Sequence, residues 1–175
     1  MAMAEREKGV SFKVTKDTLS PGLAKVARNC GNPKAVLQDM GDELVSMTVQ
    51  AFTNSSFRAM PWPPVKKAGG QPLYASGALK HSIRITALTN NFVMVGTDRL
   101  YASYHQFGTR PYDIIAKAKK ARFWPGARHP VKKVHHPGLP ARPFFPFNES
   151  GEMIPAAKQR IEATAKAALT KLMQP

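Results

Sequence analysis

The sequence predicts an α+β fold: an antiparallel β-sheet packed by a long amphipathic helix, with a basic β-hairpin arm and a C-terminal helix. Three observations support this fold class. After Asn32-Pro33, apolar residues recur at spacings of three and four, the period of one helix face. Residues 82–95 contain alternating apolar and polar side chains around a polar turn, as a β-hairpin does. Residues 110–142 are rich in basic and turn-forming residues, which predicts a protruding arm.

The first third of the chain is predicted to hold a short strand and two helices. Residues 10–14 alternate as a strand does. Ser20-Pro21 marks a helix start, because serine caps free amides and proline fits the first turn. A helix over about residues 33–54 places Asp39, Asp42 and Glu43 outside an apolar face made by Val36, Leu37, Met40, Leu44, Val45, Thr48, Ala51 and Phe52. Burying each large apolar side chain contributes about 1.5–3 kcal/mol, so we expect this helix to dock on the sheet.

The middle of the chain is predicted to begin with a loop and continue as strands. Three prolines surround Trp62 in residues 54–79 and exclude both helix and central strand, so we interpret Trp62 as a plug over the core. A hairpin follows at 82–95, with its turn at residues 89–91. Residues 101–107 are expected to form a third strand.

Weaker strand candidates follow within the arm, and the chain ends in a helix. The candidates are residues 114–115, 121–124 and 131–134, with Pro125-Gly126 as the turn between the last two. The alanine-rich C-terminal helix, over about 153–173, has a narrow apolar face that suits packing at a domain edge or against a neighbouring subunit.

Composition is that of a globular protein with an unusual charge. At 175 residues, 43% of them hydrophobic, we expect a single domain over 1–175. The lone Cys30 excludes an intrachain disulfide and favours a reducing cytosol. We expect neither a membrane span nor a secretory signal. Twenty-six Lys and Arg against 11 Asp and Glu give +15, which favours an acidic partner. The alternative is an ordinary solvated basic surface.

The residue patterns predict no catalytic residue, cofactor site or metal site. His129, His135 and His136 have no Cys, Asp or Glu at ligand spacing, and adjacent histidines in an extended segment point to opposite faces. Cys30 is expected at a helix C-terminus, where the dipole disfavours a thiolate. No P-loop, Gly-x-Ser-x-Gly or dinucleotide-binding motif is present. We therefore do not expect an enzyme.

The arm is the remaining candidate for function. Its nine cationic side chains are Arg110, Lys117, Lys119, Lys120, Arg122, Arg128, Lys132, Lys133 and Arg142, and Asp113 is the only acid among them. Phe123 and Trp124 packing on Val131 and Val134 would close it as a hairpin. A connection longer than about 12–15 residues in a compact domain is usually functional or disordered. We interpret this one as an arm that reaches a neighbouring subunit or a phosphate backbone; the alternative is a solvated insertion.

Four motifs in order resemble a known family. Residues 101–109, YASYHQFGT, resemble the "YA.yhqFGt" block of virion morphogenesis and tail-completion proteins of tailed bacteriophages. Residues 73–83 resemble their "L..SG.L..SI" block, and Trp62-Pro63-Pro64 is similar to the tryptophan turn before it. Residues 140–145, PARPFF, match the "PARPF" signature. Residues 119–138 are similar to a basic hairpin of related head–tail connector proteins. The resemblance covers about residues 30–150.

The resemblance implies a structural protein of the phage neck, without catalytic residues. Such proteins form rings, commonly hexameric, that cap the finished tail or seal its joint with the head. The implied partners are identical copies and neighbouring neck and tail proteins in the virion, after assembly in the host cytoplasm. Six copies at +15 would total about +90, so acidic neighbours or genomic DNA in the channel are expected. The alternative from another class is a free basic nucleic-acid-binding protein.

Aromatic side chains are the expected anchors, either at subunit interfaces or in the core of one chain. Aromatic residues are enriched at the centres of interfaces, and for at least one of Phe144, Phe145 and Phe147 an ordinary core position within the chain is an equal alternative. The candidates are Trp62, Tyr101, Tyr104, Phe107, Phe144, Phe145 and Phe147.

Overall fold

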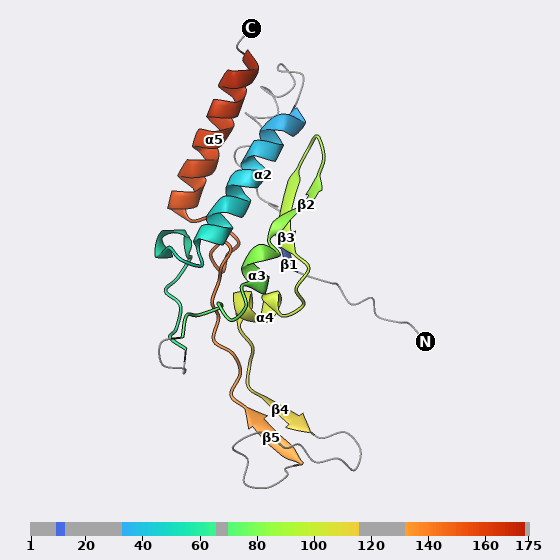
Figure 1. Cartoon of the computed structure of the whole chain (residues 1–175), viewed down its shortest axis with the longest axis vertical. Helices are drawn as coiled ribbons and strands as arrows, with labels where there is room; N and C mark the ends of the chain where they lie inside the picture. The colour runs from blue at the N-terminus through green and yellow to red at the C-terminus, as the bar shows by residue number, and fades with distance from the viewer. Residues whose placement is uncertain (1–9, 13–32, 66–69, 116–131, 174–175) are drawn as a thin grey trace, which may run out of the picture.

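The computed structural model describes residues 10–12, 33–65, 70–115 and 132–173. It confirms the α+β class, with helices and two small antiparallel sheets. The molecule is elongated, with two long helices at one end and the arm at the other (Figure 1). The predicted helix start at Ser20-Pro21, the strand candidate 121–124 and the Pro125-Gly126 turn lie outside the described residues.

The main sheet has three antiparallel strands in the order β1 (Val10–Phe12), β3 (Val93–Thr97), β2 (Arg84–Leu88). The β2–β3 pairing confirms the predicted hairpin, whose turn is closed by a 2.9 Å hydrogen bond from the Thr89 N–H to the Phe92 carbonyl. β2 starts two residues later than predicted. The reason is the short helix α3 (Ala78–His81), which ends with the N–H and hydroxyl of Ser82 both donating to the Leu79 carbonyl.

Helix α2 (Pro33–Gln50) lies between the sheet and helix α5 (Pro155–Met173), as Figure 1 shows. It approaches the sheet closely at Gly41, where a Cβ atom would lie only 2.6 Å from Cγ2 of Val93. Its other side packs on an apolar stripe of α5 that includes Ala157, Ile161, Ala165 and Ala168. The C-terminal helix therefore packs within the chain.

Glu43 departs from its predicted position outside the contact face of α2. Its carboxylate forms a 2.5 Å ion pair with Arg160 of α5, because the helix is covered on two sides rather than one. The guanidinium of Arg160 also lies 5.1 Å from the ring centre of Phe57, in the 3-10 turn η1 (Ser55–Phe57). This turn and the start of α3 are the regular structure within the predicted loop over 54–79.

The prediction of a third strand over residues 101–107 is wrong, because this segment forms helix α4 (Ala102–Phe107). Its YASYHQF sequence is compatible with both the helical period of about 3.6 residues and the strand period of two. The deciding feature is that Ala102 and Gln106 are buried while Tyr104, midway between them, is exposed: a strand would place all three on one face, whereas a helix turns Tyr104 away from the other two. Gly108, with φ of +71°, ends the helix.

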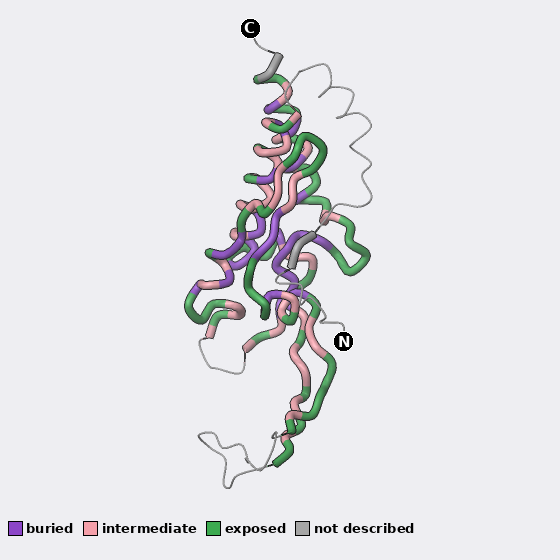
Figure 2. The backbone as a smooth tube through the Cα atoms, turned by 90° about the vertical axis from the view of Figure 1, so that its right-hand side faces the viewer, coloured by how far each residue is buried: buried purple, intermediate pink, exposed green. Residues whose placement is uncertain are grey.

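The centre of the core is the extended segment of residues 142–147, called here the core segment. Phe144 and Phe145 are fully buried, and Phe147 is 5% exposed. The Phe144 ring lies 5.8 Å from that of Phe52, which in turn meets Trp62 edge-on at 5.8 Å. Figure 2 shows the buried residues gathered at this level of the molecule.

The core segment belongs to no strand of either sheet, so several of its main-chain polar groups are satisfied by side chains. The amide oxygen of Gln106 accepts hydrogen bonds from the N–H groups of Phe144 (3.0 Å) and Phe145 (3.2 Å). The indole N–H of Trp62 donates to the Pro143 carbonyl at 2.8 Å. These hydrogen bonds hold helix α4 and the loop around Trp62, called here the tryptophan loop, to the core segment.

Replacing Gln106 with methionine tests this arrangement. Gln106→Met keeps the length of the side chain but leaves two buried N–H groups without an acceptor, at about 1–3 kcal/mol each. We expect the free energy of unfolding to fall by roughly 2–5 kcal/mol in urea denaturation. The same substitution on the surface, Gln38→Met, should change it by less than about 0.5 kcal/mol. A loss below about 1 kcal/mol in Gln106→Met would show that the core segment does not depend on this side chain.

Candidate functional site

The arm leaves the body through a narrow base closed by two glycines. Gly108 and Gly138 have φ of +71° and +87°, which other residues adopt only under strain. A Cβ atom on Gly108 would lie 2.7 Å from the carbonyl oxygen of Leu139. Between the glycines, Thr109 and Leu139 form an antiparallel bridge, with the Thr109 N–H donating to Leu139 at 2.9 Å. The two chains of the arm are thus fixed to each other where they leave the core.

Beyond the base, the arm is a two-stranded antiparallel ribbon of β4 (Tyr112–Ile115) and β5 (Lys133–His136). β5 starts two residues after the candidate strand at 131–134, and its partner is β4. Every described residue of the arm is exposed or half-buried, and the ribbon extends away from the body (Figure 2). An isolated two-stranded ribbon is marginally stable in water. Among the residues that the structure describes, little therefore stabilises this ribbon.

One face of the ribbon is charged. The carboxylate of Asp113 lies 2.9 Å from Nζ of Lys133 and 3.0 Å from Nδ1 of His135. Hydrogen bonds from Lys133 and then His135 hold the pKa of Asp113 below its ordinary value of 3.8. The three side chains are solvent-exposed, so these pairs contribute little to stability. They link β4 to β5 across this face of the ribbon.

The other face of the ribbon is aromatic and aliphatic. The rings of Tyr112 and His136 stack at 4.9 Å, and Ile114 lies opposite Val134. Tyr112 is 48% exposed. On the charged face Ile115 is 63% exposed, although isoleucine is among the most often buried residues. Apolar side chains thus reach solvent on both faces of the ribbon.

The outer side of α4, just before the arm, is a second exposed apolar surface. We call it the aromatic face; it consists of Leu100, Tyr101, Tyr104 and Phe107, which are between 41% and 65% exposed. Tyr104 and Phe107 are three residues apart and lie on one face of the helix, and Leu100 is in the turn just before it. Clustered exposed apolar side chains of this kind mark interaction sites. The aromatic face and the ribbon form the candidate site.

The structure distributes the predicted arm cations unevenly. Arg110, Lys132 and Lys133 are exposed on the arm. Five others lie outside the described residues: Lys117, Lys119, Lys120, Arg122 and Arg128. Arg142 is 8% exposed and lies in the body, where it donates hydrogen bonds to the carbonyls of Pro63 and Pro64. Its placement on the exposed arm is therefore corrected: the arm ends before it.

The predicted aromatic anchors separate into two groups. Trp62, Phe144, Phe145 and Phe147 are core residues. Tyr101, Tyr104 and Phe107 are exposed. The sequence does not single out Leu100, Tyr112 and Ile115, because a short turn or a four-residue strand gives no pattern that shows which apolar residue faces solvent. Gln106 was not predicted either, because nothing distinguishes it in the sequence from a surface glutamine.

Within the described ranges, no three His, Cys, Asp or Glu side chains are grouped as metal ligands. His135 faces Asp113, while its neighbour His136 stacks on Tyr112, on the opposite face of the ribbon. None of the described helices combines the length and apolar character needed to cross a membrane.

Comparison with protein-family models matches residues 14–170 to the phage virion morphogenesis family. This span includes α2, the β2–β3 hairpin, α4, the arm, the core segment and most of α5. The search of curated proteins and that of solved structures both find no match.

The titration of Asp113 tests the ribbon. Because its pKa is lowered in the folded state, its contribution to stability is full above pH 3.8 and is lost as the pH falls through the lower, folded value. We expect its carboxyl carbon to titrate with a midpoint below 3.8 in NMR. In Asp113→Asn, amide exchange at Ile114 and Val134 should be about two- to fivefold faster. Asp39→Asn, on α2, should leave both amides unchanged. A midpoint at or above 3.8 would show that the pairs do not form in solution.

Proposed function

Because the chain belongs to the phage virion morphogenesis family, we propose that it completes or terminates a phage tail and joins it to the head at the neck, acting as an oligomeric ring. The family assignment carries the coarser conclusion, a structural role in virion assembly. The position in the neck and the ring are the proposal. The single observation that best supports this position and this ring is the arm, whose ribbon is not covered by any described part of the body.

The arm has the properties of an element that is completed by another molecule. Its apolar residues Tyr112 and Ile115 are exposed, and no described part of the body covers either face of the ribbon. In the proposed ring, the ribbon of one copy lies on the aromatic face of the next. A contact between two different surfaces of identical subunits closes into a ring when the rotation between copies divides a full turn. A hexamer is the symmetry that we propose.

Charge supports a ring with acidic neighbours or DNA. The described arm has Arg110, Lys132 and Lys133 against the single carboxylate of Asp113. The whole chain has +15, so six copies total about +90 before counterions bind. Neighbouring neck and tail proteins, and genomic DNA passing through the channel, are the proposed partners that offset this charge.

A free nucleic-acid-binding protein is the alternative, and the exposed apolar residues favour assembly over it. Phosphate contacts require cations and polar donors. They provide no partner for Ile115 or Leu100, which are each at least 60% exposed. Subunit contacts bury such side chains.

A charge placed on the ribbon tests the ring. Ile115→Glu introduces a carboxylate at the proposed contact, where burying it is costly. We expect the dissociation constant of the oligomer to rise at least about a hundredfold, measured by light scattering after size exclusion. Tyr104→Glu, on the aromatic face, should have the same effect. The control is Phe92→Glu, in the β2–β3 turn far from the arm (Figure 1); it should leave the oligomer intact.

The alternative predicts different behaviour of the unmodified chain. A chain that stays monomeric at about 100 µM, and that retards duplex DNA with a steep dependence on salt, would be a free nucleic-acid-binding protein. If rings persist in both Ile115→Glu and Tyr104→Glu, the arm and the aromatic face do not form the subunit contact. Loss of rings in these variants alone, with unchanged thermal unfolding, supports the proposed arrangement.

A further inference from the structure

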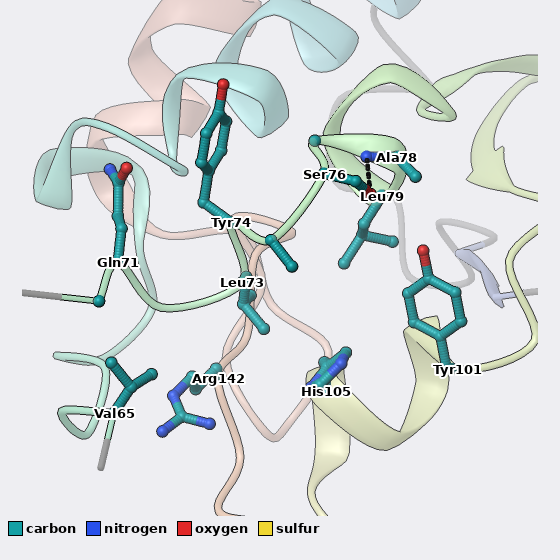
Figure 3. Close-up of a pocket in the computed structure, with 13 residues that line it drawn as sticks. Val65, Gln71, Leu73, Tyr74, Ser76, Ala78, Leu79, Tyr101, His105 and Arg142 are labelled. Carbon is teal, nitrogen blue, oxygen red and sulfur yellow. Dashed lines mark hydrogen bonds between the residues drawn. The ribbon is translucent and has the colours of Figure 1, made fainter. Parts of the chain in front are cut away.

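A pocket of about 590 Å³ opens on the body between the loop of residues 70–77, α3 and α4 (Figure 3). Leu73 and Leu79 form an apolar part of its wall, and Tyr101 stands at one side. Arg142 and His105 lie together at the opposite end from Tyr74. The pocket thus combines apolar walls with a cation.

Among the described residues, Arg142 is a buried cation without an anionic partner. Its side chain lines the pocket, and it is 8% exposed. Nε and Nη2 donate to the carbonyls of Pro63 and Pro64, at 3.0 Å and 3.2 Å. No carboxylate among the described residues lies within ion-pair distance of it. Carbonyls satisfy its donors but do not neutralise its charge, and buried charges are normally paired.

The neighbouring histidine adds no second charge to the pocket. Burial, and then the positive charge of Arg142, lower the pKa of His105, so its ring is neutral at pH 7. The net positive charge of the lining residues therefore comes from Arg142.

The shape and charge select the class of ligand. A guanidinium binds carboxylates and phosphates well. The leucines beside it favour a carboxylate on an otherwise apolar segment, because a duplex phosphate backbone is polar on every side. A second copy is a poor source, since each copy has a net charge of +15.

We propose that this pocket binds an acidic peptide segment of a partner protein, with an Asp or Glu carboxylate at Arg142 and a flanking apolar side chain against Leu73 and Leu79. Its source, a neighbouring virion protein, rests on the proposed function; the binding itself does not. The ribbon and the aromatic face then contact identical copies, while the pocket, which borders the aromatic face at Tyr101, takes a different protein.

Peptide titration of the full chain tests the pocket. The probe is acetyl-Leu-Asp-Leu-amide, and the matched control has Asn in place of Asp. We expect saturable NMR shifts of the amides of Ser76 and Ala78, with binding at least about tenfold weaker for the Asn peptide. Inorganic phosphate is titrated in parallel and should bind more weakly than the Asp peptide.

A pair of variants at the pocket wall keeps the test independent of folding. Arg142 itself holds the tryptophan loop, so its replacement would disturb the body. Ala75 lines the pocket and is exposed, and so a longer side chain there leaves the core untouched. Ala75→Glu supplies a competing carboxylate and should weaken the Asp peptide at least about tenfold, whereas Ala75→Gln should not.

Three results would overturn the proposal: no saturable shift at about 10 mM peptide, equal binding of the Asp and Asn peptides, or tighter binding of phosphate than of peptide. Equal binding to Ala75→Glu and Ala75→Gln would place the peptide elsewhere and also overturn it. Ring formation is measured on other variants and by light scattering, so either proposal can fail without the other.

Discussion

The structure depends on satisfying the main chain of the core segment at the centre of the molecule. A buried extended segment normally belongs to a sheet, where neighbouring strands pair its N–H and carbonyl groups. Here the amide of Gln106 and the indole of Trp62 replace those strands. The arrangement joins α4, the loop around Trp62 and the buried phenylalanines into one unit, because the side chains of Gln106 and Trp62 supply hydrogen-bond partners that the core segment lacks. Three short motifs that are far apart in the sequence therefore meet in the fold: the Trp62 motif and residues 101–109 both bind residues 140–145.

The same contact positions the candidate site. In the sequence, α4 comes just before the arm and the core segment comes just after it. The Arg142 N–H donates to the His105 carbonyl at 2.7 Å, just inside the bridge at the base. Both chains of the arm therefore leave from fixed points, and the exposed ribbon and the aromatic face keep a defined relation to the body. A surface built for assembly needs this property, because its geometry must repeat from one copy to the next.

Long periodic segments could be predicted from the sequence, and long-range contacts could not. The α2 helix, the β2–β3 hairpin and the C-terminal helix follow from patterns over many residues. Residues 101–107 are too few to distinguish the two periods, and only the fold, in which Gln106 binds a segment 38 residues away while Tyr104 stays exposed, shows the helix. Arg142 looks like the last cation of the arm until its carbonyl partners, 79 and 78 residues distant, are known. The exposure of Ile115 likewise depends on the absence of a covering layer.

The continuity of the arm with the core has a mechanical consequence. In the proposed ring, tension on the ribbon from an adjoining subunit would be carried along the backbone through Leu139 to Phe144 and Phe145, which are wholly enclosed. The arm would then pull on the buried core rather than on a surface loop, which is an anchorage suited to an assembly whose joints must hold under load.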